Sequence, residues 1–168
     1  MTTRLLCYSL TGHTRSVARE IADRIGAEPH EIDAPGPAKP GMWSIVRLAF
    51  TALFHRPQSI RVPDIYWADG ELLIIGTPVW AGRVSSPVRA WLDRRPALPD
   101  RVAFLVTSGD PRRPDNVFRE LARLTGRVPV AELHVSEAML TAGDTGPAIA
   151  EFCGKLRPAP TPAQALAG

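Results

Sequence analysis

The sequence has few cysteines and no long hydrophobic run. Cys7 and Cys153 are the only cysteines, and neither lies in a Cys-x-x-Cys pair, so we expect reduced thiols and a cytoplasmic location. No run of 18 apolar residues occurs, which argues against a membrane span. The first residues do not combine a charged segment with a long apolar one, so we expect no signal peptide.

Patterns typical of metal, nucleic-acid and hydrolytic sites are also missing. The four histidines are far apart in the sequence, at His13, His30, His55 and His134, which gives no metal-ligand spacing. Net charge is +3 and the pI is about 9.3, but no block of five basic residues or nucleic-acid module occurs, so we predict no nucleic-acid partner. Gly-x-Ser-x-Gly is absent and no Ser-His-Asp set is evident, so we predict no catalytic side chain.

What the sequence does contain is a regular alternation of strand and helix patterns over its 168 residues. Short, largely apolar segments predict buried strands at 4–9, 71–76 and 101–107, and two further strands are predicted at 29–32 and 128–135. Apolar stripes at helical spacing predict helices at 14–25 closed by Gly26, from 85–87 onward, from an N-cap at Asp115 to Gly126, and at about 145–156. Strands that are apolar on both faces belong in a parallel sheet covered on both sides. We therefore predict one α/β domain over 1–157, a doubly wound five-stranded parallel sheet with helices on both faces, and a disordered tail at 158–168.

Ligands of such sheets bind beyond the carboxyl ends of the strands. Three predicted loops occupy that edge, at 9–14, 77–87 and 108–116. Any binding site should be assembled from these three segments.

The first loop has the features of a phosphate site. It consists of Ser9, Leu10, Thr11, Gly12, His13 and Thr14. Three hydroxyls and a glycine precede a predicted helix, where free N–H groups and the positive end of the helix dipole attract anions. The alternative is that serine and threonine merely cap the helix, but a cap uses one hydroxyl and not three.

Other phosphate-binding motifs do not fit this loop. A P-loop needs Gly-Lys before its last serine or threonine, and a dinucleotide loop needs Gly-x-Gly-x-x-Gly, whereas only Gly12 is present. A tyrosine phosphatase needs an arginine six residues after its cysteine, and that position holds His13. Cys7 is therefore interpreted as a core residue.

Two motifs in this order resemble the flavodoxin family. Ser9-Leu10-Thr11-Gly12-His13-Thr14 is similar to the Ser/Thr-x-Thr-Gly-x-Thr loop that holds the phosphate of flavin mononucleotide (FMN). Ile75-Gly76-Thr77-Pro78-Val79-Trp80-Ala81-Gly82-Arg83 resembles the Gly-Thr-Pro-x-Trp loop of flavodoxin-like proteins and related FMN reductases. The resemblance covers nearly the whole chain up to about Leu156 and implies a flavodoxin-like fold with FMN as cofactor.

The resemblance also implies which residues lie near the flavin. Pro78, Val79, Trp80, Ala81 and Gly82 would run along the isoalloxazine ring, and Ser108, Gly109 and Asp110 would contact its pyrimidine edge. An aromatic side chain offers apolar area to a flat ring, and Gly82 permits close backbone approach. Two alternatives stay open: Trp80 is a core tryptophan, and Ser-Gly-Asp-Pro is an ordinary turn.

Two features depart from many flavodoxins. The loops beside the predicted ring are basic, with Arg83, Arg112 and Arg113, which would favour an anionic reduced flavin unless these are solvated surface charges. An insertion at 34–66 carries a segment, 42–54, that is apolar nearly all round. Such a helix must be buried, and we expect it to form a homodimer contact or a lid near the flavin.

We expect an FMN-dependent redox protein that passes electrons from NAD(P)H or a protein partner to an acceptor such as a quinone. Whether it is an electron shuttle or a reductase is left open by the residues. The alternative is a flavin-free module that keeps the fold and captures a phosphorylated ligand or protein.

Overall fold

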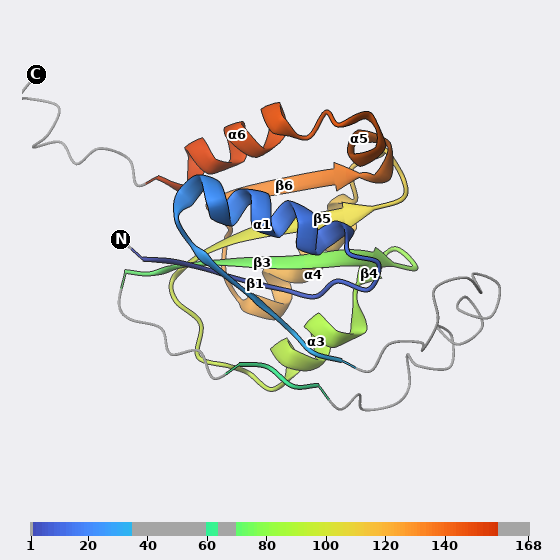
Figure 1. The fold of residues 1–168 in the computed structure, drawn as a ribbon. Helices are drawn as coiled ribbons and strands as arrows, with labels where there is room; N and C mark the ends of the chain where they lie inside the picture. The colour runs from blue at the N-terminus through green and yellow to red at the C-terminus, as the bar shows by residue number, and fades with distance from the viewer. Residues whose placement is uncertain (1, 35–59, 64–69, 158–168) are drawn as a thin grey trace, which may run out of the picture.

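The computed structural model describes residues 2–34, 60–63 and 70–157 (Figure 1). The predicted apolar helix at 42–54, most of the 34–66 insertion and the predicted tail at 158–168 lie outside these residues. Within the described part, Asp33 and Arg61 form an antiparallel bridge through two backbone hydrogen bonds of 2.9 and 2.8 Å.

The centre of the fold is a parallel sheet. Its strands, in the order β2-β1-β3-β5-β6, are β2 (Glu28–Glu31), β1 (Thr3–Cys7), β3 (Leu72–Trp80), β5 (Arg101–Ser108) and β6 (Ala131–Ser136). All neighbouring pairs in this order are parallel. The five predicted parallel strands are confirmed, and the chain order reverses at β1, where ligands of doubly wound sheets bind.

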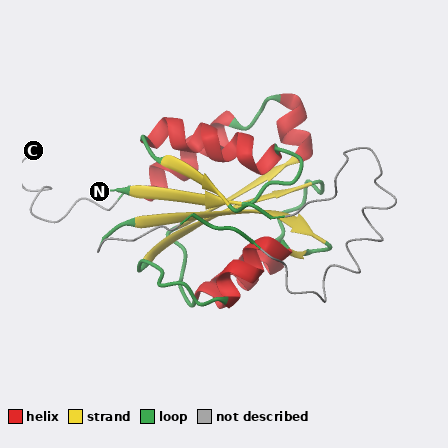
Figure 2. Ribbon diagram, turned by 60° about the horizontal axis from the view of Figure 1, so that its bottom comes forward, coloured by secondary structure: helices red, strands yellow, loops and turns green. Residues whose placement is uncertain are grey.

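Helices cover both faces of the sheet, as predicted (Figure 2). The helices α1 (His13–Ile25) and α6 (Gly146–Leu156) contribute to one buried cluster, and α3 (Ser86–Asp93) and α4 (Asp115–Thr125) contribute to the other. Because side chains alternate along a strand, Phe104 and Leu105 of β5 belong to different clusters.

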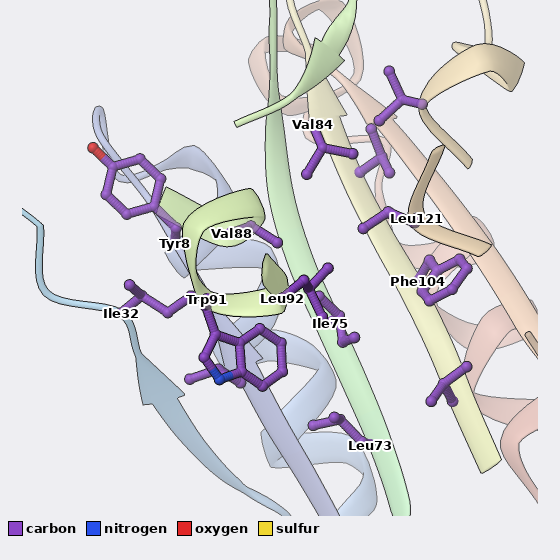
Figure 3. Packing of buried hydrophobic residues seen from close by; sticks show 14 of the residues in the cluster. Tyr8, Ile32, Leu73, Ile75, Val84, Val88, Trp91, Leu92, Phe104 and Leu121 are labelled. Atoms are coloured by element: carbon purple, nitrogen blue, oxygen red, sulfur yellow. The ribbon is translucent and has the colours of Figure 1, made fainter. Parts of the chain in front are cut away.

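The cluster to which α3 and α4 contribute covers one face of the sheet. Figure 3 shows Val88, Trp91 and Leu92 of α3 near Ile75 of β3, with Leu121 of α4 on the same side. Each is at most 5% exposed. This packing fixes α3 and α4 beneath the segments that leave β3 and β5.

The segment at 77–87 is not the loop that we predicted. Strand β3 continues to Trp80, and a short strand, β4 (Arg83–Val84), pairs antiparallel with its end. Ala81 and Gly82 form the two-residue turn, both with positive φ, at 49° and 76°. Positive φ at both positions is the geometry that joins tightly paired antiparallel strands. The glycine and proline that indicated a loop therefore belong to a hairpin.

Two helix predictions also need correction. Asp115 is the first residue of α4 and not its N-cap, which is Pro114. A short helix, α5 (Glu137–Ala142), follows β6 and was not predicted. None of its residues is buried, so it has no apolar stripe from which a helix could be inferred.

Candidate cofactor site

Three segments meet at the carboxyl edge of the sheet: the turn between β1 and α1, the β3–β4 hairpin and the turn after β5. Two contacts join them directly. The hydroxyls of Thr14 and Thr107 are 2.8 Å apart and buried. The rings of Tyr8 and Trp80 meet edge to face, with centroids 5.4 Å apart and planes at 86°. The structure thus brings together the segments that the sequence assigned to one site.

The start of α1 is open to an anion. Gly12 is the N-cap, in the left-handed region with φ 97°, and no side chain of the described residues caps the helix. The first helical bond of this turn runs from Ser16 N–H to the Gly12 carbonyl, at 2.9 Å, so helix geometry supplies no acceptor for the N–H groups of the three preceding residues. Among the described residues, no hydroxyl accepts an N–H group of this first helical turn.

The three hydroxyls of the first loop have different roles. Thr14 is 1% exposed and bonds Thr107, so its hydroxyl lies inside the protein. Ser9 Oγ accepts the N–H of Gly12 at 3.1 Å and keeps its own proton available as a donor. Thr11 is exposed, as is His13 at the first position of α1. The groups that this loop offers to a ligand are therefore backbone N–H groups and the hydroxyls of Ser9 and Thr11.

The exposed part of the hairpin is its turn, whereas Trp80 is buried. Trp80 is 9% exposed and belongs to the core cluster that contains Tyr8, as in the alternative interpretation of this residue. Pro78 and Val79 are half-buried, whereas Ala81 and Gly82 are exposed. The turn is the accessible part of this segment.

Side chains of α4 hold the hairpin in place. Asn116 Nδ2 donates to the carbonyl oxygen of Gly82. The carboxylate of Glu120 accepts the N–H of Val84 at 3.0 Å and pairs with Arg83 at 3.0 Å and Arg89 at 3.6 Å. Asn116 and Glu120 face this turn only because α4 packs beneath it, so no sequence motif indicated them.

The turn after β5 is organised by Ser108. Its Oγ donates to the Asp110 carbonyl at 2.7 Å and lies 2.8 Å from Nε2 of His134 on β6. The Asp110 carboxylate accepts side-chain and backbone N–H groups of Arg112, which lower the Asp110 pKa to about 2. Burial, and to a lesser degree Arg113, lower the His134 pKa. No motif in the sequence indicated a role for His134 at this edge.

The basic residues beside this edge are paired with carboxylates. Arg112 contacts Asp110 at 2.8 Å, and Arg113 contacts Asp115 at 2.8 Å and also Glu132. Arg83 pairs with Glu120, as described above. The positive charges that we expected to act on a reduced flavin are locally offset.

Neither cysteine is suited to thiolate chemistry in this state. Both are free thiols, and burial raises the pKa of Cys7 to about 12, as expected for a core residue. Among the residues that the structure describes, no group of His, Cys, Asp and Glu could hold a metal ion. Across 2–34, 60–63 and 70–157, no helix is long and apolar enough to cross a membrane.

Comparison with known proteins identifies the fold. No family profile matches the sequence, and no curated protein matches it. An FMN complex of a flavoprotein from Lactobacillus acidophilus is 21% identical, with a TM-score of 0.65 over 84% of this chain and 97% of the other. The chain has a flavodoxin-like fold. The expected doubly wound parallel sheet with helices on both faces is confirmed, and its strand order places β1 between β2 and β3.

Other flavodoxin-like proteins align over most of their length. A WrbA-like flavodoxin from Agrobacterium tumefaciens is 19% identical, with a TM-score of 0.57 over 93% of this chain and 97% of the other. An apo NADH:FMN oxidoreductase is 15% identical, with a TM-score of 0.51 over 98% and 94%. At these identities the likeness concerns the fold.

Proposed function

We propose that this protein binds FMN at the carboxyl edge of its sheet and uses it for electron transfer. The observation that carries the proposal is the start of α1, where Gly12 is the N-cap and, within the part of the chain that the structure describes, no side chain caps the helix. A phosphate monoester fits such a helix end, because the N–H groups and the helix dipole compensate its charge. The FMN complex of the Lactobacillus acidophilus flavoprotein, which shares this fold, supports the same choice of ligand.

In this proposal the three segments divide the cofactor between them. The phosphate lies on residues 9–14, the isoalloxazine ring lies along the exposed turn at Ala81 and Gly82, and the pyrimidine edge meets Ser108, Gly109 and Asp110. Bound FMN would supply the redox chemistry, and the chain would bind and orient it. Trp80 then supports the ring-side turn from the core.

The phosphate assignment can be tested with two glycine variants at opposite ends of α1. Gly12 and Gly26 both have left-handed φ, 97° and 66°, and a Cβ at either position has no heavy atom closer than 4.0 Å. Both substitutions place a Cβ at positive φ, and the φ of 97° at Gly12 lies further from the left-handed values that L-residues adopt, so the free energy of unfolding of both variants is measured beside their FMN affinity. We expect only Gly12→Ala to weaken FMN binding, measured by quenching of flavin fluorescence.

A colourless protein that does not bind FMN would overturn the proposal and favour a flavin-free module that captures a phosphorylated ligand. Equal loss of affinity in both glycine variants would place the phosphate elsewhere. If FMN binds, steady-state oxidation of NADH and NADPH with a quinone acceptor distinguishes a reductase from an electron shuttle. The NADH:FMN oxidoreductase with this fold supports testing a nicotinamide donor first.

A further inference from the structure

The turn after β5 is tied to the neighbouring strand by one side-chain contact. The parallel register of β5 and β6 places Val106 opposite His134 and Ser108 opposite Ser136. Side chains alternate along a strand, so His134 projects from the same face of β6 as Ser136, the residue opposite Ser108. Its Nε2 lies 2.8 Å from Ser108 Oγ.

The direction of this hydrogen bond follows from the other contact of Ser108. A serine hydroxyl has one proton to donate, and Ser108 donates it to the Asp110 carbonyl at 2.7 Å. Ser108 Oγ must therefore accept from His134, and Nε2 of His134 carries a proton. A histidine that donates to a serine cannot act as its general base, so this pair is not a nucleophile and its base.

The two bonds in series define the shape of the turn. His134 fixes the position of Ser108 Oγ, and Ser108 in turn holds the carbonyl of Asp110, two residues further along. Gly109 and Asp110 are exposed. Among the described residues, no hydrogen bond uses the backbone N–H of either one. The turn therefore presents two oriented N–H donors at the same edge of the sheet as the start of α1.

Among the residues at 2–34, 60–63 and 70–157, no other side chain makes a hydrogen bond to Ser108. Arg112 bonds the Asp110 side chain, which lies at the far end of the turn and is 48% exposed. Glu137, at the start of α5, lies 3.6 Å from where a Cβ on Gly109 would stand, and it offers only acceptors. The charged groups that act on His134 are Arg113 and Asp110.

We propose that His134 is a positioning residue for the cofactor, which it serves by fixing Ser108 and thereby orienting the N–H groups of Gly109 and Asp110. This inference rests on the proposed function, because those N–H groups would face the acceptor-rich pyrimidine edge of a flavin. His134 itself does not touch the ligand. His134 keeps the turn ordered in the ligand-free protein, which lowers the entropic cost of binding.

The first test uses the ligand-free protein. In the wild-type protein, ¹⁵N relaxation should give order parameters of about 0.85 for the N–H groups of Gly109 and Asp110. The substitution His134→Leu should lower these order parameters towards about 0.6. His134→Gln, whose amide can still donate to Ser108, should restore them. Ser108→Ala removes the same connection from the other side and should have the effect of His134→Leu. Unchanged order parameters in His134→Leu and Ser108→Ala would overturn the inference.

The second test measures FMN affinity in the same variants. His134→Leu should weaken binding roughly five- to tenfold, as expected for losing one hydrogen bond that orders the site, and His134→Gln should recover most of it. The matched control is His30→Leu, because His30 lies in β2 and its buried Nε2 has no hydrogen-bond partner among the described residues. His30→Leu should leave FMN affinity unchanged.

The two tests separate this inference from the proposed function. Wild-type protein that does not bind FMN rejects the proposed function, whereas the order parameters of the ligand-free protein still report on His134. Wild-type protein that binds FMN with an affinity unchanged by His134→Leu rejects the positioning role alone. An equal loss in His134→Leu and His134→Gln would also contradict it.

Discussion

Thr14 and Thr107, separated by 93 positions in the sequence, share a buried hydrogen bond of 2.8 Å between their hydroxyls. Thr14 belongs to the first turn of α1, and Thr107 lies near the carboxyl end of β5. The bond therefore joins the phosphate-binding segment that we propose to the strand that leads to the Ser108 turn. It fixes the relative position of two parts of the candidate site.

The energy of this contact can be measured with valine substitutions. Thr14→Val or Thr107→Val leaves one buried hydroxyl without a partner, which we expect to lower the free energy of unfolding by about 1–3 kcal/mol. The double variant leaves neither hydroxyl and should be more stable than the sum of the two losses predicts. Urea denaturation of the four proteins measures this coupling, and strictly additive losses would show that the two hydroxyls do not interact.

Ala81 is the one residue of the hairpin turn for which glycine is better suited. Its φ of 49° is costly for an L-residue with a Cβ, so Ala81→Gly should raise the free energy of unfolding by about 0.5–1 kcal/mol. The same change at Ala150, exposed within α6, should lower it by about 1 kcal/mol. Thermal or urea unfolding of both variants checks the opposite signs, and destabilisation by both would reject the turn geometry.

The stability of the fold should depend on pH through His134. Its pKa in the folded protein lies below the ordinary value of 6.5, so the unfolded chain binds more protons between the two values. The contribution of His134 to the free energy of unfolding is complete above about pH 6.5 and decreases as the pH falls from there through the lowered pKa. Asp110 changes charge in a separate window, between its ordinary value of 3.8 and about 2.

His134→Gln provides the comparison for this pH dependence. Because glutamine does not titrate, the variant should lose less stability than the wild type between pH 7 and pH 5, measured by urea denaturation at each pH. Parallel profiles for wild type and His134→Gln would contradict the lowered pKa.

The strands were predictable because their apolar side chains are continuous. Residues such as Leu72 to Ile75 are fully buried on both faces of the sheet, which only a covered parallel sheet allows. The glycines that end α1 and α4, Gly26 and Gly126, were equally clear, and both have left-handed φ.

What the sequence did not predict depends on partners that are distant along the chain. Pro78 indicated a loop, but in the structure it lies in β3 opposite Thr107 of β5. The contact between Ser108 and His134 depends on the register of β5 and β6, which no local pattern determines. The burial of Trp80 depends on Tyr8, which directly follows β1. These features follow from packing and not from local sequence patterns.

The most direct test of the proposed phosphate site is a comparison of FMN with riboflavin, which lacks only the phosphate. If the phosphate binds the start of α1 through two or more charge-assisted hydrogen bonds, FMN should bind roughly 100-fold more tightly. Fluorescence titration of the wild-type protein with both ligands measures the ratio. A ratio near 100 is the result that this account predicts, and equal affinities, or no binding of either flavin, would contradict it.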